Sequence, residues 1–188
     1  MIRYKLTIVK AILLCYITFM EVAILTKSSI RIKGKTAVLV VDPQDKSESN
    51  AALVFSKPPE SVNTIGAEVV LNGPGEYEIG GVKITGMRNE LDLMYSMSVD
   101  SVSLLLGKLT TLEKMQQKLK ESNILVVNCD NVGDPAFLTS LVTNVIIFYG
   151  EHAGEVGKAF GQDNVKHLSK YASTIEKLPA EVETVILE

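Results

Sequence analysis

The sequence lacks the residues that several common kinds of functional site require. It has no tryptophan, only two cysteines, Cys15 and Cys129, and only two histidines, His152 and His167. Two cysteines cannot build a disulfide framework, which fits a reducing compartment. Two imidazoles are very few for a metal centre that is assembled from several histidines. These scarcities argue against a disulfide-rich secreted domain and against an ordinary histidine-rich metal site.

An excess of charge of either sign is also missing. Nineteen Lys and Arg residues face 22 Asp and Glu residues, so the formal net charge is −3. Such a balance creates no field that would draw the chain to nucleic acid or to an anionic membrane, and no stretch interleaves basic and aromatic residues. With 188 residues, 46% hydrophobic and 22% charged, the chain has the size and composition of one globular domain.

No apolar run reaches the length of about 20 residues that a membrane-spanning helix needs. The longest run, Ala11 to Leu25, follows Arg3, Lys5 and Lys10 and is interrupted by Glu21. It resembles the apolar part of a signal peptide, although no small-residue cleavage site follows. Three interpretations stay open here: a signal or anchor, a structural element, or an extension that precedes a natural start at Met20.

Short apolar runs separated by turn residues predict many strands. The expected strands are residues 22–25, 36–41, 51–55, 68–71, 82–85, 98–106, 124–127, 145–149, 165–168 and 182–187. Residues 111–122, 135–142 and 154–160 are expected to form helices, with Thr110 or Thr111 capping the first and Asp134 the second. Strands dominate the first half and strand–helix units the second, which predicts an α/β or α+β domain of two sheets faced by helices.

The segment from Asn72 to Gly86, NGPGEYEIGGVKITG, predicts a tight hairpin. Its turn must reverse the chain within about two residues, and glycine adopts the backbone angles that such turns need without a Cβ clash. We therefore expect a positive φ at Gly75 and at Gly80 or Gly81.

This hairpin resembles the Gly-Pro-Gly-Glu-Tyr-Glu-Ile hairpin of small bacterial metallo-β-lactamase-fold hydrolases. Five further segments are similar to the same proteins: the opening from Met20 to Gly34, the strand from Thr36 to Pro43, the segment Leu106 to Leu109 (similar to their Leu-Gly-Asp-Leu), the late strand from Val145 to Tyr149, and the ending from Leu178 to Leu187. The resemblance implies a four-layer αββα sandwich. Because it begins at Met20, it favours reading residues 1–19 as an extension and residues 20–188 as a single domain.

Active members of this fold bind one or two metal ions, usually zinc, through histidines and aspartates, and the resemblance implies where those ligands would stand. In this chain the corresponding pocket positions carry other residues: Lys27, Lys57, Pro59, Ser61, Val62, Lys108, and Tyr149 or Gly150. None of these is a usual zinc ligand, and the ammonium groups of Lys57 and Lys108 at such a site would oppose a divalent cation. We therefore expect no metal and no other cofactor, and a cleft that would favour an anion.

Few residues remain as candidates for catalysis. His152 lies just beyond the late strand, and Asp92 and Asp130 are the carboxylates that a rearranged site could use; Cys129, Glu90 and His167 complete that set. A solvated loop histidine and a buried thiol are the simpler interpretations of His152 and Cys129.

Two hypotheses follow from this pattern. The first is a catalytically inactive, cytoplasmic protein of this fold that binds an unidentified ligand or protein. The second is a metal-dependent hydrolase with a rearranged site. No nucleic-acid partner is indicated, and contact with a membrane is expected only if residues 1–25 act as an anchor.

Overall fold

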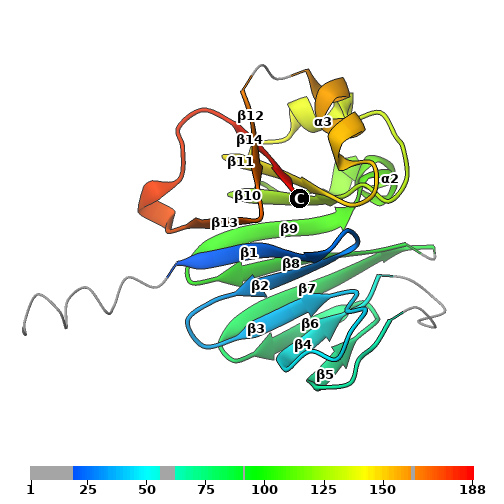
Figure 1. The fold of residues 1–188 in the computed structure, drawn as a ribbon, viewed down its shortest axis with the longest axis vertical. Helices are drawn as coiled ribbons and strands as arrows, with labels where there is room; N and C mark the ends of the chain where they lie inside the picture. Colours follow the sequence, from blue (N-terminus) through cyan, green and yellow to red (C-terminus); the bar gives the residue numbers. More distant parts are fainter. Residues whose placement is uncertain (1–18, 56–61, 91, 162–163) are drawn as a thin grey trace, which may run out of the picture.

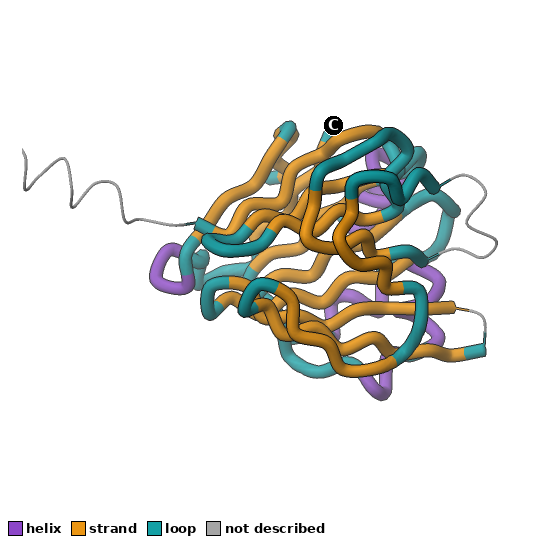
Figure 2. The backbone as a smooth tube through the Cα atoms, turned by 90° about the horizontal axis from the view of Figure 1, so that it is seen from below, coloured by secondary structure: helices purple, strands orange, loops and turns teal. Residues whose placement is uncertain are grey.

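Two β-sheets face each other and enclose the main hydrophobic core (Figure 1). The structure is a computed structural model that describes residues 19–55, 62–90, 92–161 and 164–188. Most of the regular secondary structure of the described chain is β-strand, and the helical segments are short (Figure 2). Within the described ranges, no helix combines the length and the apolar composition that crossing a membrane requires.

The first sheet has six strands. In spatial order they are β13 (Lys170–Ser173), β1 (Met20–Thr26), β2 (Ser29–Lys33), β3 (Val38–Val41), β4 (Ser49–Leu53) and β5 (Ala67–Leu71). The strands from β13 to β3 pair antiparallel, and β3, β4 and β5 pair parallel. The sheet is therefore assembled mainly from the first half of the chain, closed by one late strand.

The second sheet has eight strands. In spatial order they are β12 (Val165–Leu168), β14 (Glu183–Leu187), β11 (Val145–Tyr149), β10 (Ile124–Asn128), β9 (Val102–Lys108), β8 (Asp92–Val99), β7 (Val82–Asn89) and β6 (Gly75–Ile79). Strands β12 to β9 are parallel, and β9 to β6 are antiparallel. Because parallel strands end at the same edge, the carboxyl ends of β9, β10 and β11 lie side by side.

The helices lie against the eight-stranded sheet. Helix α2 (Leu109–Lys114) contacts β8 and β9, and α3 (Ala153–Phe160) contacts β11 and β14 (Figure 1). Three short 3₁₀ segments complete the helical structure of the described chain: η2 (Gln116–Lys118), η3 (Ala136–Ser140) and η4 (Ile175–Lys177).

Strand alternation divides the buried side chains into two clusters. On β9, Leu104 and Leu106 point between the sheets, whereas Leu105 belongs to the cluster with the helices. Strands β10 and β11 are buried at every position, which explains their continuous apolar sequences. At the ends of these strands, the residues whose side chains point toward the other sheet lie in the gap between the two sheets. These positions form the candidate site.

The expectation of a mixed α/β domain with two sheets is confirmed. Strand β11 has the expected bounds, and the glycine prediction is also confirmed, since φ is +150° at Gly75, +56° at Gly80 and +80° at Gly81. The Asp134 carboxylate accepts a hydrogen bond from the Ala136 N–H at 2.9 Å, but the helix expected over 135–142 is only the short 3₁₀ segment η3. The expectation for residues 1–18 lies outside the described residues.

Two expectations about elements are wrong, and one strand was not expected. The strand expected over 98–106 is divided between β8 and β9 by a turn at Asp100 and Ser101, both of which have positive φ. The helix expected over 111–122 begins earlier and ends at Lys114, so Thr110 and Thr111 lie inside it instead of capping it. Strand β13 was missed because its short sequence, KYAS, has little apolar pattern.

Candidate functional site

Three polar or ionisable side chains stand in one row at the carboxyl ends of neighbouring strands. Lys108 ends β9, Asn128 ends β10 and Tyr149 ends β11, and the strand register pairs Asn128 with each of the other two. All three share the parity of the inter-sheet side chains on their strands, so they face the six-stranded sheet. This row forms one wall of the candidate site.

Asp42 comes from the opposite sheet, directly after β3. Its φ of +41° is uncommon for a residue with a side chain, and its carboxylate accepts a hydrogen bond from the Phe55 N–H at 3.0 Å. Burial raises the pKa of Asp42 to about 6; the Phe55 hydrogen bond and the charge of Lys108 act against this rise, and the charge of Asp130 adds to it. The positive charge of Lys108 thus lowers the pKa of Asp42, although Lys108 belongs to the other sheet.

Asp130 is the second carboxylate of the site. It accepts hydrogen bonds from the Ser28 hydroxyl at 2.9 Å, the Asn128 amide at 3.1 Å and, more weakly, the Glu151 N–H at 3.4 Å. The Lys27 ammonium in turn contacts Glu151 Oε1 at 2.9 Å, and both of these side chains are exposed. The turn between β1 and β2 and the segment after β11 are thus held together around Asp130.

Two tyrosines close the base of the site. The Tyr95 hydroxyl donates to the Leu71 carbonyl at 2.7 Å and also lies 3.3 Å from that of Val54; burial and the charge of Asp42 raise its pKa. Tyr149 is fully buried, and among the described groups its hydroxyl has no partner in hydrogen-bond geometry, although the Asn128 side chain lies close enough to influence it. Burial, with Asp42 and Asp130 nearby, raises the pKa of Tyr149 well above its ordinary value.

Gly150 is needed where the chain leaves β11. Its φ is +115°, and a Cβ there would come within 2.9 Å of backbone atoms of Cys129 and Asp130. Cys129 itself is buried, and burial raises the pKa of its thiol to about 12. The thiol therefore stays protonated at neutral pH and is a poor nucleophile.

The candidate acids and bases from the sequence are not brought together. Asp92 lies on the same face of β8 as Met94, which is the face covered by the helices. Its carboxylate accepts a hydrogen bond from the Lys114 ammonium of α2 at 3.1 Å. His152 Nδ1 lies 3.4 Å from Glu155 Oε2. Glu90 lies in the turn between β7 and β8, and His167 Nδ1 lies 2.8 Å from Glu188 Oε1. Of the carboxylates proposed for a rearranged site, only Asp130 faces the row of Lys108, Asn128 and Tyr149.

Part of the pocket implied by the resemblance can be placed. Lys108, Tyr149 and Gly150 lie at the strand edge, and Lys27 lies near it through Glu151. Val62 is half-buried in the loop before β5. Lys57, Pro59 and Ser61 lie outside the described residues, so their positions stay predictions.

The groups at this edge do not fit the zinc that the resemblance implies. Zinc prefers imidazole, thiolate and carboxylate ligands, usually three or four together. In the described part of the chain, no group of three or more His, Cys, Asp or Glu residues could hold a metal ion. Lys108 adds a positive charge that acts on Asp42, and this charge would repel a divalent cation.

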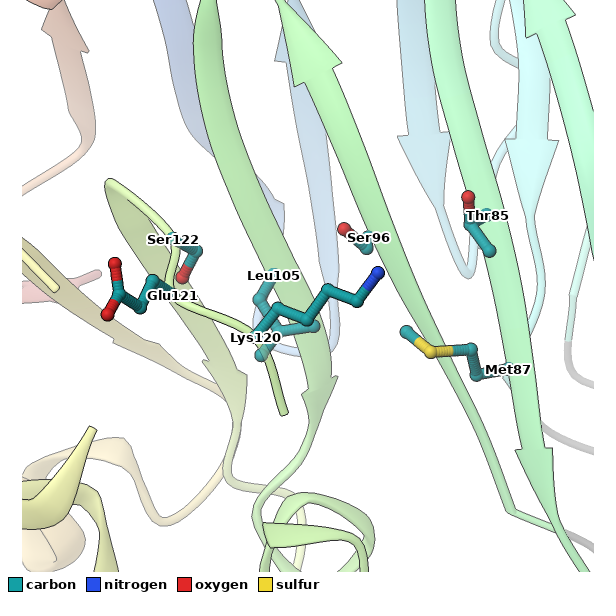
Figure 3. A pocket seen from close by; sticks show the side chains of 7 residues that line it. All are labelled: Thr85, Met87, Ser96, Leu105, Lys120, Glu121 and Ser122. Carbon is teal, nitrogen blue, oxygen red and sulfur yellow. The ribbon is translucent and has the colours of Figure 1, made fainter. Parts of the chain in front are cut away.

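Three hollows in the described chain differ in size. The first, about 70 Å³, lies on the outer face of the eight-stranded sheet, where Lys120 reaches across toward Ser96 and Met87 (Figure 3). The second, about 540 Å³, is lined by the end of β1, the start of α3 and the end of β14, including Lys27, Gly150 and Glu151. A third, about 450 Å³, lies over the hairpin strands β6 and β7 and includes Glu76, Glu78 and Lys83 in its lining. Ligand pockets usually measure about 300–1,000 Å³, so the second and third have room for a small molecule and the first does not.

Sequence reasoning missed two members of the site. Ser28 and Asn128 both bond Asp130, but a serine after a strand and an asparagine ending one are too common to single out. Asp42 follows the strand expected over residues 36–41, and from the sequence its simplest role is in the turn that ends that strand. The available signal was its position after a buried apolar run, where ligand-contacting residues often lie in α/β sheets.

Solved structures with a similar fold come from two bacteria and an archaeon. A protein of Thermotoga maritima, described as a Zn-dependent hydrolase of the metallo-β-lactamase superfamily, has a TM-score of 0.69 and 15% identity over 90% of this chain and 99% of its own. One of Parabacteroides distasonis, described as a metal-dependent hydrolase, has a TM-score of 0.60 and 11% identity over 91% and 94%.

A third structure, a metallo hydrolase of Ignicoccus hospitalis, has a TM-score of 0.57 and 8% identity over 76% of this chain and 91% of its own. No family model matches the chain, and neither does any curated protein. At these identities the likeness concerns the fold and not the activity. The chain therefore has the fold of the metallo-β-lactamase superfamily.

Proposed function

We propose that this chain is a non-catalytic protein of the metallo-β-lactamase fold, which acts by binding a ligand or a protein partner. The observation that supports this most is Lys108. Lys108 stands at a position where the resemblance would place an aspartate ligand of a metal site, and its charge acts on Asp42. A lysine at that position supplies a positive charge from within the chain, and this charge disfavours the binding of a metal cation beside the carboxylates of Asp42 and Asp130.

The remaining groups of the site are poor substitutes for a metal-bound water. In metal-dependent hydrolases the ion lowers the pKa of its water to about 7, so that hydroxide is available for attack. Here burial holds the Cys129 thiol protonated with a pKa of about 12 and raises the pKa of Tyr149 well above its ordinary value. Neither group supplies an anionic nucleophile at neutral pH.

The hollow of about 540 Å³ is where we propose that a small ligand binds. Ile24, Leu25 and Leu187 give it an apolar lining, and the Lys27–Glu151 ion pair lies in its wall. The Glu151 N–H that bonds Asp130 connects this wall to the polar row. A ligand with an apolar body would bury surface there without entering the site of Lys108.

The alternative is a hydrolase with a rearranged site, and one observation favours it. A general base works best when its pKa lies near the working pH, and the pKa of Asp42 is about 6. Against this, Asp42 is already engaged by the Phe55 N–H and by the charge of Lys108.

The two proposals differ in metal content and turnover. We expect the full-length protein, purified from medium supplemented with zinc and manganese, to hold far less than one ion per chain by mass spectrometry. We also expect it to show no hydrolysis of ester, lactam and phosphodiester probes beyond that of its Asp42→Asn variant. A stoichiometric ion, or a turnover that Asp42→Asn abolishes, would overturn the non-catalytic proposal.

A further inference from the structure

Four strands lie at the ends of the two described sheets, and three of them carry charged or ionisable side chains along the strand. Native proteins usually place charges on edge strands, because an uncharged edge offers free backbone groups on which another chain can pair. The residues concerned on β6, β12 and β13 are Glu76, Glu78, Lys166, His167 and Lys170. The last three of these contact acidic side chains within the described chain. The fourth edge strand, β5, differs from these.

Strand β5, at the lower end of the molecule in Figure 1, presents an apolar edge. Val69 and Val70 are each 42% exposed, and the nearby Ile65 is 65% exposed. Successive residues of a strand point to opposite faces, so the two valines expose apolar surface on both faces of β5. The one charged residue of β5 is Glu68, whose carboxylate accepts a hydrogen bond from the Asn50 amide of β4 at 3.2 Å. This charge is therefore held toward the neighbouring strand instead of the open edge.

We propose that β5 pairs antiparallel with β5 of a second copy of the chain, about a two-fold axis at Val70. In this register Val70 lies opposite itself, Val69 lies opposite Leu71, and Glu68 lies opposite Asn72, the exposed residue after the strand. Each carboxylate therefore faces a neutral amide, and no like charges stand opposite each other. An axis at Val69 would instead make the two Glu68 residues diagonal neighbours on one face of the sheet, which is unfavourable. The charge pattern thus selects the axis at Val70.

A second copy fits this edge better than a foreign extended peptide does. A peptide that adds a strand to a sheet edge gains specificity from pockets that receive its alternate side chains. Residues of β5 line none of the three hollows of about 70, 450 and 540 Å³ in the described chain. Valine pairs across two strands need no pocket, because β-branched side chains pack against each other on the pleated surface. Two-fold pairing uses the same edge of both copies, so the assembly closes at a dimer.

The test is the mass of the full-length protein, measured by analytical ultracentrifugation over a wide range of concentration. We expect the mass to rise from that of one chain, 20.5 kDa, to twice that value and no further. One short strand pair forms a small interface, so the dimer should dissociate on dilution. A protein that stays monomeric at every concentration, or that forms oligomers larger than two chains, would overturn the inference. Self-association neither requires nor excludes a bound ligand or catalysis, so metal content and turnover test the proposed function separately.

Substitution at the two-fold axis tests whether β5 is the surface that pairs. Val70→Lys places two ammonium groups opposite each other and should leave only the monomer. Val132→Lys is the matched control, because Val132 is 63% exposed and lies outside β5, in the loop after β10; this variant should dimerise like the wild type. Thermal midpoints of both variants show whether the fold is retained.

A charge swap tests the register of the pairing. Val70→Glu alone should also be monomeric, because it brings two carboxylates together at the axis. Mixing Val70→Lys with Val70→Glu places opposite charges across the axis and should restore the dimer. A dimer that survives Val70→Lys, or that the mixture of folded variants fails to restore, would overturn the pairing at Val70.

Discussion

At the scale of single residues, the hairpin glycines differ in what surrounds them. Gly80 and Gly81 both have positive φ, but a Cβ on Gly80 would lie 2.9 Å from both the Ala37 Cβ and the Thr36 carbonyl oxygen, whereas one on Gly81 would meet only the Thr36 hydroxyl, at 3.7 Å. Substitution at Gly80 therefore adds a steric clash to backbone strain, and substitution at Gly81 adds strain alone.

We expect Gly80→Ala to lower the free energy of unfolding by about 2 kcal/mol or more, and Gly81→Ala by about 1 kcal/mol. Urea denaturation of both variants, with the wild type alongside, measures this difference. Equal losses would show that the segment of Thr36 and Ala37 moves away from Gly80 without cost. A smaller loss at Gly80 than at Gly81 would contradict the predicted order outright.

The functional residues were only partly predictable from the sequence. Lys108 and Tyr149 were placed by the family resemblance, and Tyr149 also ends a continuous apolar run that was expected to form a strand. Their partners could not, since Asp42 and Ser28 reach the site from turns of the other sheet, about 65–120 residues away along the chain. Periodicity fixes which residues share a strand face, but not which turn lies opposite them.

At the scale of elements, the same limit separates the strands that were foreseen from those that were not. Strands β10 and β11 are buried on both faces, and their continuous apolar sequences are a strong signal. β13 lies at the edge of its sheet, alternates exposed and buried residues over only four positions, and carries no such signal. A short edge strand of this kind forms because it pairs with its neighbour, here β1, and not because its own sequence favours a strand.

The pairing of β13, β1 and β2 is supported by a cluster of charges. Glu21 of β1 contacts Arg31 of β2 at 3.0 Å and Lys170 of β13 at 3.4 Å. Burial alone would raise the pKa of Glu21, but the hydrogen bonds from Arg31 and Lys170 outweigh it, and the pKa is lowered from 4.5. The ionised carboxylate therefore stabilises the fold at neutral pH, and this contribution is lost as the pH falls through the lowered pKa.

We expect Glu21→Gln to cost about 0.5–1 kcal/mol at pH 7 and progressively less as the pH falls below about 4.5. Denaturant unfolding at pH 7 and pH 3.5 measures both values. Glu48→Gln is the control, because its ion pair with Lys46 is longer, at 3.6 Å, and both side chains are exposed. A Glu21→Gln cost that does not change with pH would mean that the lost stability comes from packing.

At the scale of the whole molecule, one cluster of buried side chains fills the space between the two sheets of the described chain. Met20, the first residue of β1, is fully buried in the cluster between the sheets, while the preceding Phe19 is half exposed and lies under the Lys177 ammonium, which is 5.7 Å from its ring centre. The buried packing of the described chain thus begins at the residue where the family resemblance begins. A sandwich of this size buries enough apolar surface to be stable as one domain.

We therefore expect deletion of residues 1–19 to leave the thermal midpoint within a few degrees of the full-length value. The described contact that the deletion removes is that of Phe19 with Lys177, and a surface cation–π contact contributes only about 0.5–1 kcal/mol. Calorimetry of the two chains under the same conditions makes the comparison, with a Phe19→Ala variant to separate this contact from the rest. If the deletion costs several kcal/mol more than Phe19→Ala, the first residues belong to the core and the boundary at Met20 is wrong. If the stability is unchanged but the full-length protein alone sediments with membranes, the segment acts as an anchor attached to an independently stable domain.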